Sequence, residues 1–276
     1  MLMKIPYKNT QIKFITKGKN EPLVLLHGFL ESKEIWRDYL ELLSKERQVI
    51  TIDLLGHGET GNIAPIHSME DMADSVIEVL NYLEIEKANF AGHSMGAIIS
   101  MALLEKHSNW LKAGIFIGIP VYQDADEFKK IMSSHSFVDR ISTSRFSKYI
   151  CMIHPIFMSR AFKPDNLTDD VYEDAKKHHW QSYYYSLTRI ILKTDLYGIA
   201  RKIRNTKVLF IHGAKDTTAP LKNAIDLSRE FTNVKTVTST GGDHQFFLKE
   251  AEFVWKTIQD FSVSDKKSQK TILNEY

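Results

Sequence analysis

Ser94 lies in a short motif that is typical of a nucleophilic serine. Residues 92–96 read Gly-His-Ser-Met-Gly, a match to G-x-S-x-G, and they fall where a strand predicted at 88–91 meets a helix predicted at 94–106. Flanking glycines permit the tight turn that such a serine needs, because a Cβ would block the close backbone approach. The helix N-terminus can also stabilise an anion. The alternative interpretation is a helix N-cap serine with glycines for packing.

His244 and Asp216 are the residues that we predict to activate this serine. A serine hydroxyl is a poor nucleophile at neutral pH, so it needs a base within hydrogen-bond reach and a carboxylate that holds the base in the correct tautomer. Asp216 follows a strand predicted at 207–211, and His244 follows the next strand, predicted at 234–238. Both therefore belong to loops at the same edge of a parallel sheet. The chain order Ser, Asp, His fits a nucleophile of this type.

Other interpretations of the acid and the base remain open at this stage. Asp216 can instead be a turn-forming aspartate or the N-cap of the following helix, and His244 can be an ordinary surface-loop histidine. Asp243, Asp124 and Asp126 are rivals for the role of the acid. Asp124 is the strongest rival, because it follows another strand at the same edge of the sheet.

Two backbone N–H groups are predicted to bind the oxygen that becomes negative in a tetrahedral intermediate. Met95 follows the nucleophile directly, so its N–H is the first donor. The second is expected from the loop after the strand predicted at 22–26, where we favour the N–H of Phe29. Gly28 lets that loop lie flat against the nucleophile turn. We expect His27 to anchor the loop by hydrogen bonds rather than to join in proton transfer.

Short apolar segments alternate with segments of helical period along most of the chain, which is typical of an α/β fold with a mostly parallel central sheet and helices on both faces. Strands are predicted at 22–26, 48–53, 88–91, 113–119, 207–211 and 234–238, after a hairpin of 5–7 and 12–16, with helices at 33–44, 69–83, 94–106, 221–231 and 249–261. We predict that residues 1–120 and 200–276 form this core. We expect the polar tail from Ser264 onward to be frayed or to lie loosely on the surface.

The alternation stops between 121 and 199, where the sequence becomes helical and aromatic and predicts a helical cap. An apolar lid excludes water and long polymers, so we expect a small-molecule substrate of small to medium size with an apolar part. The residues predicted to bind it are Leu30, His93, Tyr122, Phe146, Trp180 and Phe246. The alternative is that the aromatic side chains only pack the cap onto the core.

Composition excludes several classes of function. The 276 residues carry a formal net charge of +2, with basic and acidic residues interspersed, so we expect no nucleic-acid partner. Cys151 is the single cysteine, which excludes an internal disulfide and favours the cytoplasm. No run approaches the roughly 18 apolar residues of a membrane span, and no export signal is evident. Metal-ligand spacing and a G-x-G-x-x-G motif are missing, so we predict no metal and no cofactor. The oligomeric state is unknown from sequence.

The chain resembles the α/β-hydrolase fold superfamily, in the group with a helical cap after the sixth strand. The resemblance rests on the His-Gly-Phe loop at 27–29, the motif at 92–96, the D-x-x-G-x-G-x-S/T-like segment at 53–60, and Trp36. It covers essentially residues 5–262, although the cap matches only in position and helical character. The sequence departs from the family's pattern at two places that do not affect the chemistry. Thr60 stands where serine is commoner, and Gln-Phe-Phe follows His244, where proline is often found nearby. His57 and Gly58 fit a structural loop.

The resemblance implies a serine hydrolase with a Ser-His-Asp triad. We expect carboxylic ester hydrolysis through an acyl-enzyme, as in an esterase. An aspartate in place of Ser94 would have indicated a dehalogenase or an epoxide hydrolase. Because a fold does not fix a reaction, a carbon–carbon bond hydrolase or lyase with the same triad is an alternative. A small-molecule receptor or signalling module and an inactive scaffold are the others.

Overall fold

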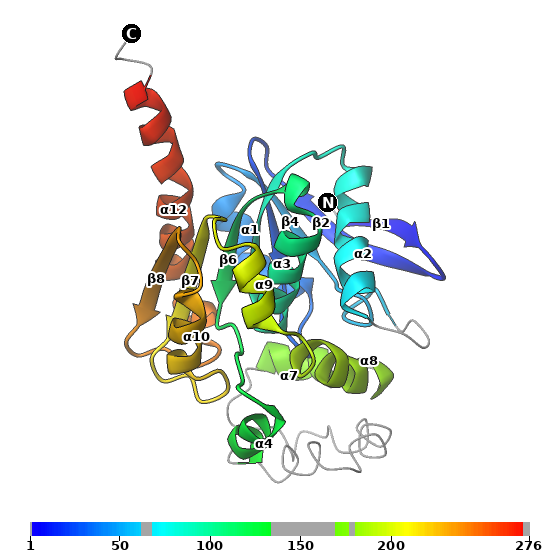
Figure 1. Cartoon of the computed structure of the whole chain (residues 1–276). Helices are drawn as coiled ribbons and strands as arrows, with labels where there is room; N and C mark the ends of the chain where they lie inside the picture. Colours follow the sequence, from blue (N-terminus) through cyan, green and yellow to red (C-terminus); the bar gives the residue numbers. More distant parts are fainter. Residues whose placement is uncertain (1, 62–67, 134–168, 177–179, 273–276) are drawn as a thin grey trace.

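Eight strands form one sheet within the residues that the computed structural model describes, which are 2–61, 68–133, 169–176 and 180–272 (Figure 1). The strands are β1 (Leu2–Tyr7), β2 (Thr10–Lys17), β3 (Pro22–Leu26), β4 (Gln48–Ile52), β5 (Ala88–His93), β6 (Leu111–Ile117), β7 (Val208–Gly213) and β8 (Val234–Ser239). Their order across the sheet is β1-β2-β4-β3-β5-β6-β7-β8. Strand β2 pairs antiparallel with both of its neighbours, β1 and β4. Every other neighbouring pair is parallel. The predicted sheet is confirmed.

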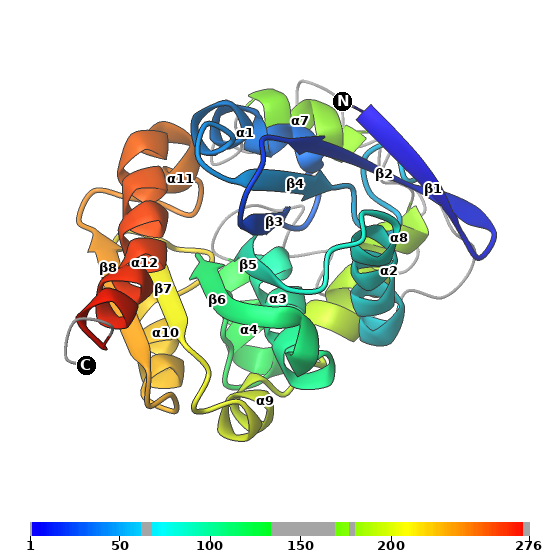
Figure 2. The same ribbon diagram turned by 90° about the horizontal axis from the view of Figure 1, so that it is seen from above.

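The central strands are buried on both faces, which explains their nearly continuous apolar sequence. In β3, Leu23 and Leu25 pack into one hydrophobic cluster, and Val24 and Leu26 pack into another on the opposite face. Helices cover both faces, as Figure 2 shows from above. The first face holds α1 (Arg37–Leu43), α11 (Phe246–Lys249) and α12 (Ala251–Ile272); the second holds α2 (Met69–Tyr82), α3 (Met95–Lys106), α9 (Leu196–Lys202) and α10 (Leu221–Ser228).

Helix α3 is the central helix and carries the nucleophile motif at its N-terminus. Every residue from Met95 to Leu104 is buried, as expected for a helix that is apolar nearly all round. The helix packs against β5 and β6 and also contacts α2 and α9. The core therefore holds this helix against the sheet and its neighbouring helices.

Two segments differ from the prediction by more than a few residues at an end. The helix predicted at 33–44 is divided into a 3-10 turn, η1 (Lys33–Trp36), and α1. The tail expected to be frayed instead continues α12 to Ile272, and the end of this helix projects away from the sheet in Figure 1. Its last turns contain several lysines and a glutamine and no glycine or proline, so no residue there ends the helix.

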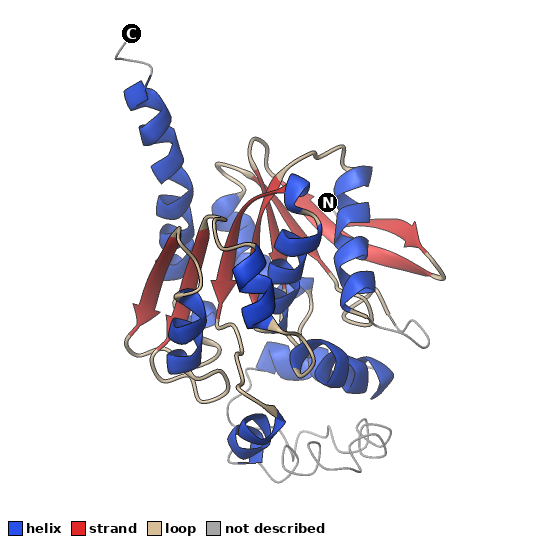
Figure 3. Ribbon diagram, viewed as in Figure 1, coloured by secondary structure: helices blue, strands red, loops and turns tan. Residues whose placement is uncertain are grey.

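The described parts of the predicted cap are helical and lie across the carboxyl ends of the strands (Figures 1 and 3). They comprise α4 (Ala125–Ser133), α7 (Asp169–Lys176), α8 (Trp180–Tyr185) and the π-helical segment η4 (Ser186–Ile191). The 3-10 turn η2 (Ser108–Trp110) lies outside this region and precedes β6 in the core. The hydroxyl of Ser32 donates to Asp174 of α7 at 2.5 Å, and the rings of Phe29 and Tyr183 lie 4.9 Å apart. Both contacts join these helices to the loop after β3.

Candidate active site

Ser94 occupies a strained turn between β5 and α3. Its φ of 51° and ψ of −117° place a non-glycine residue in a region that costs about 1–3 kcal/mol. The turn is held by the core, because the Ser94 N–H donates to the Ile117 carbonyl at 2.9 Å. A Cβ on Gly92 would lie 2.2 Å from the backbone of Gly96, and a Cβ on Gly96 would lie 2.2 Å from the Leu26 carbonyl oxygen. Both glycines are therefore required by close backbone contacts.

The structure brings together the three side chains predicted from the sequence. Nε2 of His244 lies 3.1 Å from Oγ of Ser94, and Nδ1 of His244 lies 2.7 Å from Oδ2 of Asp216. Asp216 is on the loop after β7, and His244 is on the loop after β8. An ionised carboxylate only accepts hydrogen bonds, so Nδ1 carries the proton and Nε2 presents its lone pair to the serine hydroxyl.

Asp216 is fixed by its own loop. Its Oδ1 accepts the N–H groups of Thr218 at 2.9 Å and Ala219 at 2.7 Å, which leaves Oδ2 for His244. Burial alone would raise the pKa of Asp216, but the charge and hydrogen bond of His244, with a smaller contribution from the Ala219 N–H, hold that pKa below its ordinary value. The aspartate is therefore a buried anion beside the imidazole.

The rival aspartates have other partners. Asp124 accepts the N–H groups of Asp126 and Glu127 at 2.9 and 2.7 Å, at the start of α4. Asp126 is itself 89% exposed. Asp243 accepts the N–H of Gln245 and pairs with an exposed lysine. Asp216 alone among these four contacts the His244 ring in the described part of the chain.

The surroundings of His244 suit the predicted role of a base. Burial favours its neutral form, but the charge and hydrogen bond of Asp216 outweigh this effect, and Glu31 and Asp243 add to them, so the pKa of His244 is raised. A raised pKa increases the basicity of Nε2, which is the atom that faces the Ser94 hydroxyl. The arrangement can withdraw a proton from Ser94 and stabilise the imidazolium that results.

His212 is a site neighbour that sequence reasoning missed. It is buried at the end of β7, its Nε2 lies 2.7 Å from the Ala219 carbonyl oxygen, and the same atom lies 3.5 Å from Oδ2 of Asp216. Burial lowers the pKa of His212 despite the nearby carboxylate, so the ring packs beside the acid in its neutral form. Its only sequence signal is its position directly after the strand predicted at 207–211.

The expected oxyanion donors remain a prediction, and their surroundings agree with it. Neither the N–H of Phe29 nor that of Met95 has a hydrogen-bond partner among the residues that the structure describes. His27 anchors the loop: its Nδ1 donates to the Gly28 carbonyl at 2.8 Å, and its Nε2 accepts the Leu54 N–H at 3.0 Å. Burial lowers the pKa of His27, consistent with this neutral tautomer.

The residues predicted to bind substrate fall into three groups. Leu30 and Tyr122 pack with cap side chains in one aromatic cluster, whose other members are Phe29, Phe128, Tyr183, Tyr184, Leu187 and Ile191. Phe246 is fully buried in the core with Trp36, and His93 is fully buried with both ring nitrogens bonded to protein, so neither faces a pocket. Phe146 lies outside the described residues, and of Trp180 only the backbone at the start of α8 is described.

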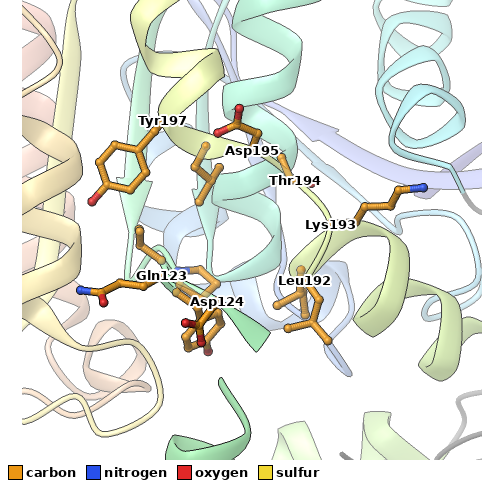
Figure 4. A pocket seen from close by; sticks show the side chains of 12 residues that line it. Gln123, Asp124, Leu192, Lys193, Thr194, Asp195 and Tyr197 are labelled. Carbon is orange, nitrogen blue, oxygen red and sulfur yellow. The ribbon is translucent and has the colours of Figure 1, made fainter. Parts of the chain in front are cut away.

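A cavity of about 280 Å³ lies beside this aromatic cluster (Figure 4). It is lined by the segment after β6, residues 120–124, and by the segment that joins η4 to α9, residues 191–197. Ser94 and His244 do not line it. Tyr122 links the cavity to the Asp216 loop, because it lines the cavity and its hydroxyl donates to the Thr218 carbonyl of that loop at 2.9 Å.

Among the described residues, no group of three or more His, Cys, Asp or Glu side chains is arranged to hold a metal ion. No described helix is both long enough and apolar enough to cross a membrane.

Comparison with known proteins agrees with the fold. Residues 21–251 match the family described as "alpha/beta hydrolase fold", and the chain belongs to this family. The AB hydrolase superfamily protein YisY of Bacillus subtilis is 25% identical over 268 residues, which cover 90% of this chain and 93% of YisY. The family supports a hydrolase but leaves the bond that is cleaved open.

Solved structures show the same fold at low sequence identity. A thermophilic esterase from Thermogutta terrifontis has a TM-score of 0.76 and 20% identity, over 96% of this chain and 98% of the esterase. The meta-cleavage product hydrolase from Pseudomonas fluorescens has a TM-score of 0.72 and 18% identity, over 95% and 98% of the two chains.

Some curated relatives match only in part. The (E)-2-((N-methylformamido)methylene)succinate hydrolase of Acinetobacter baylyi is 37% identical over 92 residues, which are 33% of this chain and 35% of that protein. For the next two relatives, the aligned region covers 22% and 42% of the relative's own length. Sequence identity over such a short region does not show that two proteins act on the same substrate.

Proposed function

We propose that this protein is a serine carboxylesterase that hydrolyses small to medium esters with an apolar part. The observation that carries the proposal is the continuous hydrogen-bonded series from Ser94 through His244 to Asp216, with distances of 3.1 and 2.7 Å. The strained backbone of the serine and its position at the start of a buried helix support the same role.

The reaction follows from this geometry in two halves. His244 Nε2 takes the hydroxyl proton as Ser94 Oγ bonds to the ester carbonyl carbon, and the N–H groups of Phe29 and Met95 bind the oxyanion. The carbon–oxygen bond to the alcohol then breaks as the imidazolium returns its proton to the leaving oxygen. Water attacks the acyl-enzyme with His244 again as base, and the acid departs as Ser94 regains its proton.

The aromatic cluster supports an apolar substrate. Phe29 and Leu30 flank the proposed oxyanion donor, and cap residues Tyr183 and Leu187 pack against them. A carbonyl that reaches the Phe29 N–H therefore has apolar side chains beside it. We also propose that residues 121–199 act as the cap over this site, and that the protein works in the cytoplasm, as its single cysteine favours.

The test is steady-state hydrolysis of p-nitrophenyl esters of graded acyl length, with Ser94→Ala as the control and a fluorophosphonate probe as a label for Ser94. Multiple turnovers that the alanine variant abolishes support the esterase. A carbon–carbon hydrolase predicts faster turnover of a vinylogous 1,5-diketone than of any ester. A single slow turnover indicates a receptor, and a folded protein that the probe does not label contradicts an active serine altogether.

A further inference from the structure

Glu31 is a buried carboxylate that the reaction above does not use. It lies on the turn after β3, two residues beyond Phe29, and is 1% exposed. Its Oε2 accepts the Gly28 N–H at 2.5 Å, and its Oε1 accepts the Gln245 side-chain amide at 3.3 Å. Both of its oxygens lie 3.1 Å from Nδ1 of His93. Burying a carboxylate is costly unless it is paired and hydrogen-bonded, and here three donors converge on it.

These contacts join the three segments that form the active site. Gly28 belongs to the proposed oxyanion turn, His93 directly precedes the nucleophile, and Gln245 directly follows the base. His93 adds a further link, because its Nε2 lies 3.0 Å from the backbone carbonyl oxygen of His244. One carboxylate therefore connects oxyanion turn, nucleophile turn and base loop.

Hydrogen bonds on both sides fix the His93 ring. The His244 carbonyl only accepts, so Nε2 of His93 donates to it. Burial would raise the pKa of Glu31, but the charge and hydrogen bond of His93, together with His27 and the Gly28 N–H, hold that pKa below its ordinary value. Glu31 is therefore a buried carboxylate whose oxygens both face Nδ1 of His93.

The turn that Glu31 holds is strained. Leu30 has a φ of 63°, a left-handed value that costs a non-glycine residue about 1–3 kcal/mol. The Glu31 N–H closes the turn on the Gly28 carbonyl at 3.4 Å, and the Glu31 side chain returns to the Gly28 N–H. A Cβ on Gly28 would lie 2.7 Å from Oε2 of Glu31 and 3.0 Å from Nδ1 of His93, so a glycine there makes room for the carboxylate.

We propose that Glu31 is a positioning residue, paired with His93, that holds the oxyanion turn, the nucleophile and the base loop in their reactive arrangement. The inference rests on the proposed function, because the arrangement matters only if Ser94 reacts. Loss of the carboxylate frees the Gly28–Glu31 turn and the His244 loop together. A displacement of about 1 Å at a reacting group can lower a rate about 100-fold.

The experiment compares Glu31→Gln and Glu31→Ala with Glu34→Gln. Glu34 lies three residues further on, and its side chain is 45% exposed, so it controls for the loss of one carboxylate in the same region. Glutamine keeps the size of Glu31 and an acceptor for the Gly28 N–H, whereas alanine keeps neither. With p-nitrophenyl butyrate we expect kcat to fall about 10-fold in Glu31→Gln and about 100-fold in Glu31→Ala, while KM changes less than about threefold. Glu34→Gln should match the wild type.

Nitrogen-15 spectra of the histidine rings provide a readout that does not depend on catalysis. In the wild type the two ring nitrogens of His93 should have the shifts of hydrogen-bonded nitrogens. In Glu31→Gln the Nδ1 signal should move, because an amide replaces the carboxylate beside that nitrogen. An unchanged Nδ1 signal in Glu31→Gln, or a wild-type kcat in folded Glu31→Ala, overturns the proposal.

The remaining outcomes also decide between the two proposals. If Glu31→Ala does not fold, Glu31→Gln decides, and wild-type values of both kcat and the His93 signals overturn the inference. If the wild-type protein hydrolyses no ester and Ser94 resists the fluorophosphonate, the proposed function fails, and the His93 spectra still show whether the pair exists. If Ser94 is labelled in the wild type and more slowly in both Glu31 variants, the positioning role is supported whatever the natural substrate is.

Discussion

Asp216 and His244 share a hydrogen bond of 2.7 Å between Oδ2 and Nδ1, and the other oxygen of Asp216 accepts two backbone N–H groups. The carboxylate therefore cannot rotate without losing bonds on both sides. Its position fixes the tautomer of His244, and this relationship determines several measurable properties of the site.

Asp216→Asn should remove the orienting charge while it preserves the shape of the loop. The amide oxygen can still accept the Thr218 and Ala219 N–H groups, but the amide nitrogen faces Nδ1 and favours the wrong tautomer of His244. We expect kcat on p-nitrophenyl butyrate to fall about 1,000- to 10,000-fold, with an unchanged circular dichroism spectrum. Asp126→Asn, at the exposed rival position, should retain wild-type activity. Equal losses of kcat in the two variants would contradict the assignment of Asp216 as the acid.

The pH dependence of activity should follow the protonation of His244. Because its pKa is raised above the ordinary value of 6.5, mainly by Asp216 against the effect of burial, the acid limb of kcat/KM is expected above pH 6.5. Neutralising the acid should move this limb to lower pH in Asp216→Asn. The measurement is kcat/KM from pH 5 to 9 with an ester whose spontaneous hydrolysis is subtracted. A wild-type limb below pH 6.5 would contradict the assignment.

The same two groups should affect stability in opposite pH ranges. The raised pKa of His244 stabilises the folded protein fully below pH 6.5, and this contribution is lost as the pH rises through the folded value. The lowered pKa of Asp216 stabilises the folded protein above pH 3.8, and this contribution is lost as the pH falls through the still lower folded value. Urea unfolding of the wild type and Asp216→Asn over this range measures both effects, and parallel curves would refute the coupling.

Gly96→Ala should destabilise the fold far more than Gly241→Ala. A Cβ at 96 would lie 2.2 Å from the Leu26 carbonyl oxygen and 2.6 Å from that of His27, whereas a Cβ at 241 would meet nothing within 4 Å. Backbone atoms cannot yield as a flexible side chain can, so we expect a loss of about 3 kcal/mol or more at 96. The change at 241 should remain within about 1 kcal/mol. Denaturant midpoints compare the two, and similar midpoints would show that β3 and α3 do not need this contact.

Phe29→Ala distinguishes the role of the Phe29 backbone N–H from the role of its side chain. The N–H that we assign to oxyanion binding remains, so kcat should stay within about 10-fold of the wild type. The ring that packs 4.9 Å from Tyr183 is lost, so KM for esters with apolar acyl groups should rise about 10-fold. Phe253→Ala, at an exposed position, is the control. A collapse of kcat at constant KM would mean that the side chain, rather than the N–H, serves the reaction.

The meeting of Ser94, His244 and Asp216 was predictable because each of them has a local signature. Ser94 lies in a motif at a strand-to-helix turn, and Asp216 and His244 each follow an apolar β-branched segment, so topology alone brings them to one edge of the sheet. Sequence periodicity also predicted the central strands to within a few residues. These features depend on neighbours in the chain, which a single sequence contains.

Glu31 and Phe246 show what a single sequence does not contain. The partners of Glu31 are 62 and 214 residues away at His93 and Gln245, so the carboxylate reads as an ordinary loop acid until the fold surrounds it. Phe246 was expected in the pocket, but the short helix α11 turns it into the core. The face to which a loop residue points depends on long-range packing rather than on local pattern.

Asp53 is fully buried and pairs with Lys33, which is almost as buried. Its carboxylate lies 3.0 Å from Nζ of Lys33 and accepts the N–H groups of Lys33 at 2.7 Å and Glu59 at 2.9 Å. Asp53→Ala leaves the ammonium with the partly exposed Glu59 as its remaining close partner, together with the more distant Glu34, and frees two backbone donors.

We expect Asp53→Ala to cost about 3–5 kcal/mol in the free energy of unfolding, because removing one partner strands a buried charge. Lys17→Ala is the control, since its pair with Glu41 is exposed on both sides and should contribute at most about 1 kcal/mol. Because Lys33 directly follows the turn that carries Phe29 and Glu31, the loss should also slow ester hydrolysis at temperatures where the variant is folded. Equal stability losses in the two variants would show that burial adds nothing to the Lys33–Asp53 pair.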